Sequence, residues 1–387
     1  MRSIAFLAPD FLANPWPRYA RFRAEEPVWW SDEIRMFCVF RHRDIRACLT
    51  GADYTVEYPF RVSRQVFGET LLDLDGPRHQ RLRRPLAGLL LGQRDNIAFR
   101  AAAGERARTA VAALPAETVL DMVAGPARAV PLTATATFLG IPAERHDWLL
   151  HTVEYLVGHL DGSSGDFGRA SALRAELEEY LLGLITSGAP PRSMLGEVHG
   201  WVRDGEITAR EAVGLATLTL AAGFETSTGL ISNTLHCLAR HPGHAAAAAA
   251  DPVRLRAFVK ETLRWEPPQH DTVRFARRDT TLAGVPVPAG SALKLMLASG
   301  NRDAEVFEHA EEFRPERSTH GSLTFGHGSH SCLGTHIALD VAEAFVGALL
   351  ARFPGLRAVD EPLPPITGST FRRPQALRMR LARKGES

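Results

Sequence analysis

Residues 325–334 combine a cysteine with glycines in a pattern that suits metal chemistry. Gly326 and Gly328 precede Cys332, and Gly334 follows it. Glycine has no Cβ, so these positions permit tight turns and let a flat ligand approach the backbone. We expect a helix over about residues 332–353, whose N-terminal N–H groups and partial positive charge would lower the thiol pKa. A thiolate is the form of cysteine that binds iron, so the segment predicts a metal-ligating Cys332. A buried cysteine at a helix cap is the plain alternative.

A second group of residues interrupts the most apolar part of a predicted helix. Within A-G-F-E-T-S at 222–227, Gly223, Glu225 and Thr226 are each unfavourable inside a buried apolar helix. Choices that break local rules are expected where function requires them. The Thr226 hydroxyl can bond back to a preceding carbonyl and make room for a small ligand, while Glu225 has the chemistry of a proton relay. Taken alone, the group would more simply be a polar kink.

Charged side chains share faces of two further predicted helices. Glu261 and Arg264 are three residues apart and His79 and Arg83 four, so each pair lies on one face. Arg274 is another candidate for anion binding, because a guanidinium bonds a carboxylate through two N–H groups. For Glu261 and Arg264 the alternative is a solvated surface pair, which is worth under about 1 kcal/mol.

The elements that must position these residues are mainly helical. One apolar helix is predicted over about residues 208–240, from a threonine N-cap to His241-Pro242. At about 33 residues it would be roughly 50 Å long, enough to cross a domain. Short strands are predicted near residues 28–40 and 270–297 and at the C-terminus. The chain has no repeat or long linker, so we expect residues 1–387 to form one mainly α domain with a minor β lobe.

Charge and composition exclude several classes of function. The 387 residues carry a formal net charge of +1, which gives no field to attract nucleic acid or an anionic membrane. The N-terminal apolar run is broken at Pro9, and no later segment has the roughly 18 uninterrupted apolar residues of a membrane span. The four cysteines form no CxxC pair or zinc-ligand pattern, and disulfides are not expected. We therefore expect a soluble protein of the cytoplasm.

The order and spacing of these motifs, from about residue 75 to residue 339, resemble those of the cytochrome P450 family. The resemblance implies the family's fold, with haem b buried between the long central helix and the cysteine-bearing helix. It implies that Cys332 is the axial ligand of the haem iron and that Phe325 packs near it. By the same resemblance, Gly223 and Gly334 contact the haem, and His330 bonds a haem propionate.

The resemblance also implies roles for the other polar residues. His79 and Arg83 would point at the haem propionates, and Arg274 matches a further propionate-binding arginine. Thr226 would hold a proton donor against the reduced oxygen, and Glu225 would relay protons from water.

A structural role is implied for a third group. The resemblance predicts that Glu261 and Arg264 are buried and that Arg317 completes the pair. The three side chains would hold the irregular stretch of about residues 301–331 against the cysteine loop.

The function implied is that of a monooxygenase. One atom of O2 would enter a small organic substrate, an intermediate of natural-product or secondary metabolism, and the other would leave as water. The 387 residues contain no flavin, nicotinamide or iron–sulfur signature, so a separate ferredoxin and ferredoxin reductase would deliver electrons from NAD(P)H. A haem-thiolate peroxygenase or isomerase, and a haem protein that only binds a ligand, remain alternatives. Glu225 and Thr226 favour the monooxygenase, because their task is to protonate reduced oxygen.

The resemblance also places residues 269–273 and 368–371 in the substrate pocket. Gln269, His270 and Asp271 make the first segment more polar than hydrocarbon binding requires. Our preferred interpretation of these three residues is a solvated turn, and recognition of a polar substrate group is the alternative.

Overall fold

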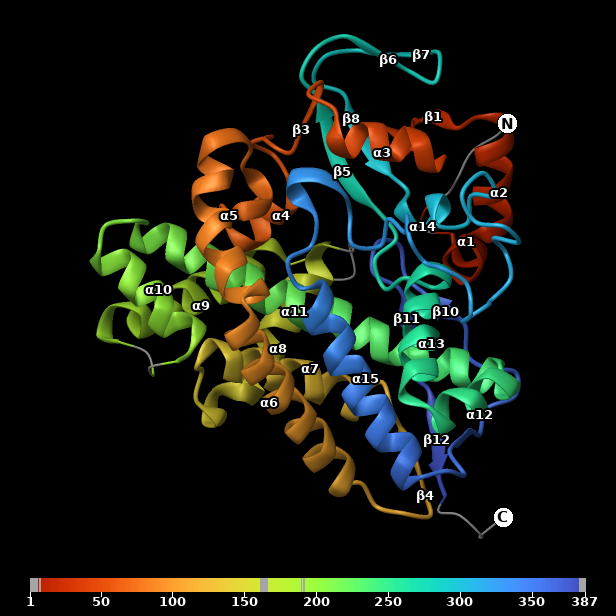
Figure 1. The fold of residues 1–387 in the computed structure, drawn as a ribbon. Coiled ribbons are helices and arrows are strands. Elements are labelled where there is room, and N and C mark those ends of the chain that lie inside the picture. The colour runs from red at the N-terminus through yellow and green to blue at the C-terminus, as the bar shows by residue number, and fades with distance from the viewer. Residues whose placement is uncertain (1–5, 7, 161–165, 189, 191, 383–387) are drawn as a thin grey trace.

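The computed structural model describes residues 6, 8–160, 166–188, 190 and 192–382. Most of these residues lie in helices, and the larger sheet is gathered at one side of the molecule (Figure 1). The prediction of a mainly α fold with a minor β lobe is confirmed. Of the N-terminal run considered above, residues 1–5 and 7 lie outside the described residues.

The α-helices are α1 (Pro9–Ala13), α2 (Trp16–Glu25), α3 (His42–Thr50), α4 (Val62–Phe67), α5 (Gly76–Leu91), α6 (Gln93–Ala112), α7 (Pro126–Leu139), α8 (His146–Leu160), α9 (Phe167–Ser187), α10 (Met194–Arg203), α11 (Ala209–Arg240), α12 (Pro242–Ala250), α13 (Pro252–Trp265), α14 (Leu297–Gly300) and α15 (Thr335–Arg352). Short 3-10 helices cover Leu71–Asp73, Ala143–Arg145 and Gly328–His330. The strands are β1 (Val28–Ser31), β2 (Met36–Val39), β3 (Tyr54–Thr55), β4 (Thr118–Asp121), β5 (Thr272–Ala276), β6 (Thr280–Leu282), β7 (Val285–Val287), β8 (Ala292–Leu295), β9 (Arg357–Ala358), β10 (Ile366–Thr367), β11 (Arg373–Pro374) and β12 (Arg378–Leu381).

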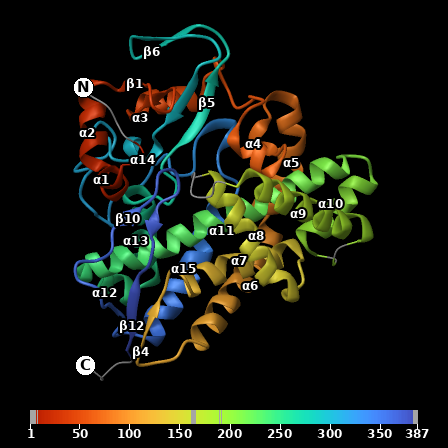
Figure 2. The ribbon, with the colours of Figure 1, turned by 180° about the vertical axis from the view of Figure 1, so that it is seen from behind.

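The long central helix α11 agrees with its sequence signals at both ends. Thr208 and Glu211 form a capping box at its start, and Pro242 opens the next helix two residues after its end at Arg240. In both views α11 crosses the middle of the molecule (Figure 1 and Figure 2), and it packs against α7, α9, α13 and α15. A helix covered on several sides must be apolar around most of its circumference, which explains its composition.

Two hydrophobic clusters meet along α11. The first half of the helix, up to Phe224, packs into a cluster with α7, α8 and α9, while the part from Leu230 onward joins a cluster with α6, α13 and α15. Glu225 and Thr226 follow Phe224 directly, so the polar motif lies where one apolar cluster ends and before the next begins. The position lets polar groups occupy a central helix without interrupting either cluster.

The larger sheet has the strand order β1-β2-β8-β5-β3. Its strand β5 carries Arg274, which pairs with Leu293 of β8. The smaller sheets are β4-β12-β9, β10-β11 and β6-β7. The β10-β11 pair brings Arg373 opposite Thr367, and β11 lies against α11.

The last helix begins later than predicted. Helix α15 starts at Thr335, with Gly334 as its N-cap, so Cys332 lies in the loop before the helix. The Cys332 N–H donates to the Phe325 carbonyl at 2.8 Å, and the Gly334 N–H donates to the Cys332 sulfur at 3.3 Å. These two bonds fix a turn at 332–334, and the predicted helix start at residue 332 is therefore wrong.

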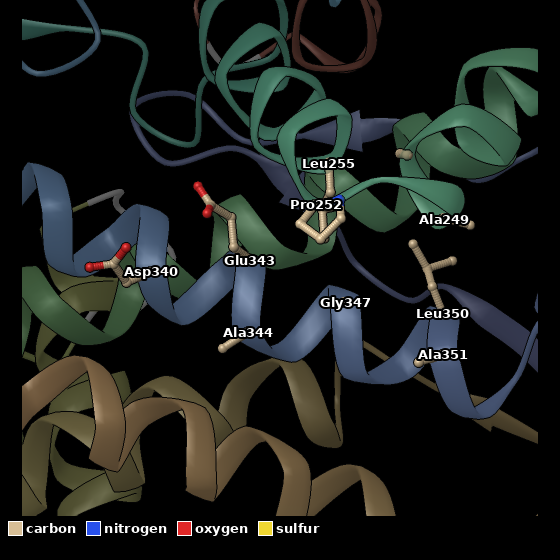
Figure 3. Close-up of a pocket in the computed structure, with 10 residues that line it drawn as sticks. Ala249, Pro252, Leu255, Asp340, Glu343, Ala344, Gly347, Leu350 and Ala351 are labelled. Carbon is tan, nitrogen blue, oxygen red and sulfur yellow. The ribbon is translucent and has the colours of Figure 1, made fainter.

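One stretch of the described chain, Gly328–Arg352, is long and apolar enough to cross a membrane by length and composition. Two acids interrupt it, Asp340 and Glu343, which pair with Arg256 of α13 at 3.6 and 2.9 Å. Figure 3 shows them on α15 beside a groove of about 490 Å³ formed with α12 and α13. Phe345 and Leu349 are fully buried, so part of the apolar composition serves packing inside the protein.

Candidate active site

The cysteine loop is closed by its own backbone. Gly326 and Gly328 have φ angles of +66° and +76°, which residues with a Cβ rarely adopt. The two glycines turn the chain so that the Cys332 N–H reaches the Phe325 carbonyl at 2.8 Å. The aromatic ring of Phe325 packs against the hydrophobic cluster around α15. The loop therefore has a fixed shape that presents one sulfur atom.

The sulfur of Cys332 is accessible, whereas the other three cysteines are buried. It accepts a hydrogen bond from the Gly334 N–H at 3.3 Å, and a Cβ built on Gly334 would lie 3.7 Å from it. Although Cys332 is exposed, the protein atoms around it keep water from part of its surroundings, and this desolvation raises the pKa of the thiol, while the Gly334 N–H, the Thr335 hydroxyl and the charge of Arg83 act in the opposite direction. The sequence-based expectation of a lowered thiol pKa is therefore wrong for the protein alone, because desolvation outweighs the loop's hydrogen bonds.

Arg83 and His79 of α5 lie beside the cysteine loop. The Arg83 Nη2 donates to the Ser331 carbonyl at 2.5 Å, so this arginine holds the residue just before Cys332. His79 is 2% exposed, and its ring centroid is 4.2 Å from that of His330. Burial, followed by the charges of His330 and Arg83, lowers the pKa of His79 to about 4. Its Nε2 has no hydrogen-bond partner within the described residues.

His330 and Arg274 line a cavity of about 360 Å³ next to the cysteine loop. The His330 Nε2 lies 2.8 Å from Asp75 Oδ1. Burial would raise the pKa of Asp75, but hydrogen bonds from His330, Thr55 and the Val56 N–H hold it below its usual range.

Arg274 is 6% exposed, and its buried position and the nearby cation Arg61 lower its pKa to about 10. A buried cation next to another cation is a favourable place for an anionic ligand.

The polar motif of α11 has an open face. The Thr226 hydroxyl donates to the Ala222 carbonyl at 2.6 Å, and Ala222 is exposed although the helix around it is largely buried. Glu225 is 6% exposed and forms an ion pair with Arg373 of β11. A Cβ on Gly223 would lie 2.7 Å from Thr135 Oγ1, so this glycine is explained by the close approach of α7.

The charged residues of α13 form a buried group. Arg264 donates to both Glu261 oxygens at 2.8 and 2.7 Å, and both side chains are 0% exposed. The Arg317 Nε lies 3.0 Å from Glu261 Oε1. Arg264 also donates to the carbonyls of Asn301 and Ala310. The structure thus brings Glu261, Arg264 and Arg317 together and joins α13 to the irregular segment before the cysteine loop.

The polar residues of the proposed substrate pocket are not solvated. His270 is 0% and Asp271 2% exposed. The His270 Nδ1 lies 3.4 Å from the Tyr19 hydroxyl, and Asp271 pairs with Lys294 at 2.8 Å. The interpretation of this segment as a solvated turn is wrong for His270 and Asp271, because tertiary packing of α2 and β8 covers them, whereas Gln269 is partly exposed.

Comparison with known proteins identifies the family. The cytochrome P450 family description matches residues 253–377. The cytochrome P450 monooxygenase PikC of Streptomyces venezuelae is 32% identical over 366 residues, which are 90% of this chain and 86% of that protein. This chain belongs to the cytochrome P450 family.

Other members of the P450 family support the same assignment. The erythromycin C-12 hydroxylase of Saccharopolyspora erythraea is 31% identical over 352 residues, covering 86% of this chain and 85% of that protein. The structure of epothilone D-bound cytochrome P450epoK has a TM-score of 0.91 at 24% identity, covering 99% of this chain and 100% of that one, and shows the same fold. The chain is therefore an enzyme of the P450 monooxygenase class, a class that uses haem and O2.

The residues of this P450 fit a haem. A planar dianionic ligand with an iron centre requires one accessible sulfur and cationic or hydrogen-bonding groups for its propionates. Cys332, whose sulfur accepts a hydrogen bond from the Gly334 N–H, would provide this sulfur. The buried Nε2 of His79 lacks a partner in the described part of the chain, and Arg274 is buried beside another cation. Both features suit carboxylates at this edge of the site.

Sequence reasoning missed two contacts in this P450 site. Arg373 pairs with Glu225 across 148 residues of sequence, and nothing in its local sequence marks it. Asp75, the N-cap of α5, pairs with His330. Asp75 does stand at the start of the motif that contains His79 and Arg83, so its position was a usable signal.

Proposed function

We propose that this P450 inserts one atom of O2 into a small organic intermediate of secondary metabolism, with electrons from a separate ferredoxin and ferredoxin reductase. The observation that carries the proposal is the motif on α11. Thr226 bonds to the Ala222 carbonyl at an exposed point of the central helix, and Glu225 directly precedes it in the same turn. An acid beside a hydroxyl supplies protons, which the reduction of O2 to water consumes.

The residues around the cysteine loop bind the cofactor. Cys332 is the axial ligand, with Phe325 and Gly334 shaping its surroundings. When bound, the haem supplies the oxidising chemistry, which electron donation from a thiolate favours. Every other task falls to the protein, which must orient the substrate, keep water out and deliver protons.

The edge of the site anchors the haem carboxylates. Arg274 and His330 line the cavity at this edge, His79 packs against His330, and Arg83 both adds positive charge and holds Ser331. His330 is also engaged by Asp75, so its propionate contact uses the ring atoms that Asp75 leaves free. Gly223 contributes by letting α7 approach α11 closely, and it would lie against the cofactor when haem is bound.

Thr226 and Glu225 manage protons. The Thr226 hydroxyl, held on the Ala222 carbonyl, accepts and orients a proton donor over the open face of α11. Glu225, paired with Arg373, takes protons from water and passes them toward Thr226. Together they favour full reduction of oxygen to water over release of hydrogen peroxide.

The substrate class rests on the relatives. Erythromycin C-12 hydroxylase acts on a natural product by its name, and this chain is similar to it along most of its length. The pocket walls include residues 269–273 and 368–371, where an isolated β-bridge joins Gln269 to Phe371. Because His270 and Asp271 are buried, Gln269 is the member of that trio available to a polar substrate group.

Electron supply and location follow from the sequence. The 387 residues have no flavin, nicotinamide or iron–sulfur motif, so electrons from NAD(P)H reach the site through partner proteins. The buried free cysteines Cys38, Cys48 and Cys237 suit the reducing cytoplasm. Neither a nucleic acid nor a membrane is a partner in this proposal.

Substitution of Thr226 tests the oxygen chemistry. In Thr226→Ala, product formed per NADH consumed falls at least several-fold and hydrogen peroxide rises, since general acid catalysis is typically worth ~10²–10⁴-fold. The measurement uses a surrogate ferredoxin system and the parent enzyme's substrate. Thr219→Ala is the matched control, because Thr219 makes the same bond to Leu215, 2.8 Å long, elsewhere in α11. Unchanged coupling in Thr226→Ala contradicts the proposed role of Thr226, and a parent enzyme that forms product without consuming NADH favours a peroxygenase or an isomerase.

Substitution of Cys332 tests the ligand assignment. Cys332→Ser removes the thiolate, and a neutral hydroxyl is a poor replacement for it. The reduced, CO-bound variant then lacks the red-shifted Soret band of a thiolate complex. A retained band would assign the axial ligand to another residue.

A further inference from the structure

A buried ion pair links the central helix to the C-terminal part of the chain. The Arg373 Nη1 contacts Glu225 Oε1, and the two side chains are 23% and 8% exposed. Glu225 follows the first hydrophobic cluster of α11, and Arg373 begins strand β11. The pair therefore places a fixed positive charge next to the acid that the proposed function uses as a proton relay.

The backbone that carries Arg373 is held firmly in place. Strand β11 pairs with β10, where Arg373 is opposite Thr367. The neighbouring Arg372 N–H donates to the Pro268 carbonyl at 2.9 Å, and its carbonyl accepts from Asn233 Nδ2 at 3.1 Å. Because Asn233 lies two turns beyond Glu225 on α11, the helix and the strand are joined at two points. A guanidinium anchored in this way can fix the carboxylate that it contacts.

The environment gives this contact a large effect. A carboxylate that is 6% exposed is strongly disfavoured in its charged form unless a cation compensates it. The Arg373 guanidinium supplies that compensation, and its planar N–H groups also fix the direction of the carboxylate. A relay residue must be ionised to accept a proton and must point consistently to pass it on. Both properties of Glu225 therefore depend on a residue 148 positions away.

We propose that Arg373 is a positioning residue of the oxygenase reaction, which keeps the Glu225 carboxylate charged and oriented for proton relay to Thr226. The inference rests on the proposed function, because the relay role of Glu225 does. It assigns to strand β11 a task separate from that of residues 368–371, which the proposed function places in the wall of the substrate pocket.

The ion pair itself is tested by a double-mutant cycle that measures unfolding of the holoenzyme. Arg373→Gln removes the cation that contacts the Glu225 carboxylate and lowers Tm, on the order of 5 °C or more. In the Glu225→Gln background the same substitution has little further effect, because no charge remains to compensate. Additive effects of the two substitutions would overturn the proposal, since the two side chains would then not interact.

The positioning role is tested by turnover. Arg373→Gln should slow product formation about tenfold and raise the solvent deuterium isotope effect, while substrate affinity and the haem spectrum stay those of the parent. Arg373→Lys keeps the charge and should recover much of the rate. Arg378→Gln is the matched control, because Arg378 lies in the nearby strand β12 and pairs with Asp360 at the surface.

Two results distinguish a failure of the positioning role of Arg373 from a failure of the proposed function. If the parent enzyme consumes NADH and forms product but Arg373→Gln does so at the same rate and with the same isotope effect, the positioning role is overturned while the proposed function stands. If the parent enzyme neither consumes NADH nor forms product with any surrogate ferredoxin system, both are overturned.

Discussion

Buried polar and charged side chains find partners differently in two groups of residues near the cysteine loop. In one group, Glu261, Arg264 and Arg317 form what we call the α13 ion triad. Arg264 uses its N–H groups on both Glu261 oxygens and on main-chain carbonyls, and the pair is 0% exposed. In the other group, His79 and Arg274 form what we call the basic pair. The His79 Nε2 has no hydrogen-bond partner among the described residues, and Arg274 is buried beside another cation.

This difference separates a structural role from a binding role. Buried polar groups normally find partners, and those that do not require an explanation. The α13 ion triad finds its partners within the chain, so its task is to connect α13 to the segment before the cysteine loop. In the basic pair, the His79 Nε2 has no partner among the described residues and Arg274 donates only to the neighbouring Val273 carbonyl among the side-chain bonds found there, at 3.0 Å, so we propose that its task is to meet an anion that the chain does not supply. Substitutions in the α13 ion triad should therefore change the stability of the fold. Substitutions in the basic pair should instead change how firmly the haem is retained.

The largest expected effect comes from breaking the α13 ion triad. Glu261→Gln leaves the Arg264 guanidinium buried without its carboxylate, which costs about 3–5 kcal/mol of unfolding free energy. Urea unfolding followed by circular dichroism measures the loss. Asp204→Asn, which removes the partner of exposed Arg203, is the control and should not change the midpoint. If Glu261→Gln unfolds at the control's urea concentration, the triad does not support the fold.

A smaller effect, on a different quantity, is expected from the basic pair. Arg274→Gln removes charged hydrogen bonds worth about 1.5–3 kcal/mol to the cofactor, so haem loss should accelerate roughly 10–100-fold. Stability of the haem-free protein should stay the same or rise, since burying an arginine is unfavourable. Transfer of haem to excess apomyoglobin measures the rate.

The control for Arg274 is Arg278→Gln, since Arg278 is 73% exposed and pairs with Asp53. It should lose haem at the parental rate. The contrasting outcome is an Arg274→Gln variant that keeps its haem but unfolds as readily as Glu261→Gln. Arg274 would then have a structural role like that of the triad.

Local signals account for the parts of the fold that were predicted. The N-cap at Thr208 and the proline at 242 define α11 to within one residue, because caps and prolines act through neighbouring backbone groups. Strands near residues 28–40 and 270–297 likewise follow from residue types and turn signals. The start of the last helix was predicted wrongly, because the N–H groups of Cys332 and Gly334 donate hydrogen bonds that form a turn. These bonds depend on the folded shape of the loop and leave no signal in the local sequence.

The candidate site was less predictable wherever contacts are distant in sequence. The sequence motifs identified Cys332, Glu225 and Thr226 as candidates, because each of these residues interrupts a local sequence pattern. The partner of Glu225 had no such signal. Arginine is common at protein surfaces, and Arg373 reaches Glu225 only because β11 packs on α11 in the folded protein. The burial of His270 and Asp271 likewise arises from Tyr19 and Lys294, which approach from other elements.

The smallest expected effect concerns acid sensitivity on the α13 side. His241 caps the end of α11 and stacks on Phe313, with ring centroids 4.5 Å apart and planes 9° apart. Phe313 directly precedes Arg314, whose N–H donates to Glu261 at 2.9 Å. Burial, then the charges of Arg240 and His244, lower the pKa of His241 to about 4. His241 therefore makes the triad's surroundings sensitive to protonation.

The sign of this effect follows from where the proton binds. The unfolded chain protonates His241 near its ordinary pKa of about 6.5, whereas the folded protein resists protonation down to about 4. The unfolded state thus binds more protons between these values, so the contribution to stability is complete above pH 6.5 and is lost as pH falls toward 4. Because the ring is partly exposed, the loss is on the order of 1–2 kcal/mol. His241→Phe keeps the stacking and removes the titration, so the parent's stability relative to this variant should be constant above pH 6.5 and decline below it. Urea unfolding at a series of pH values measures the difference, and parallel curves for the two proteins would show that acid destabilisation does not pass through His241.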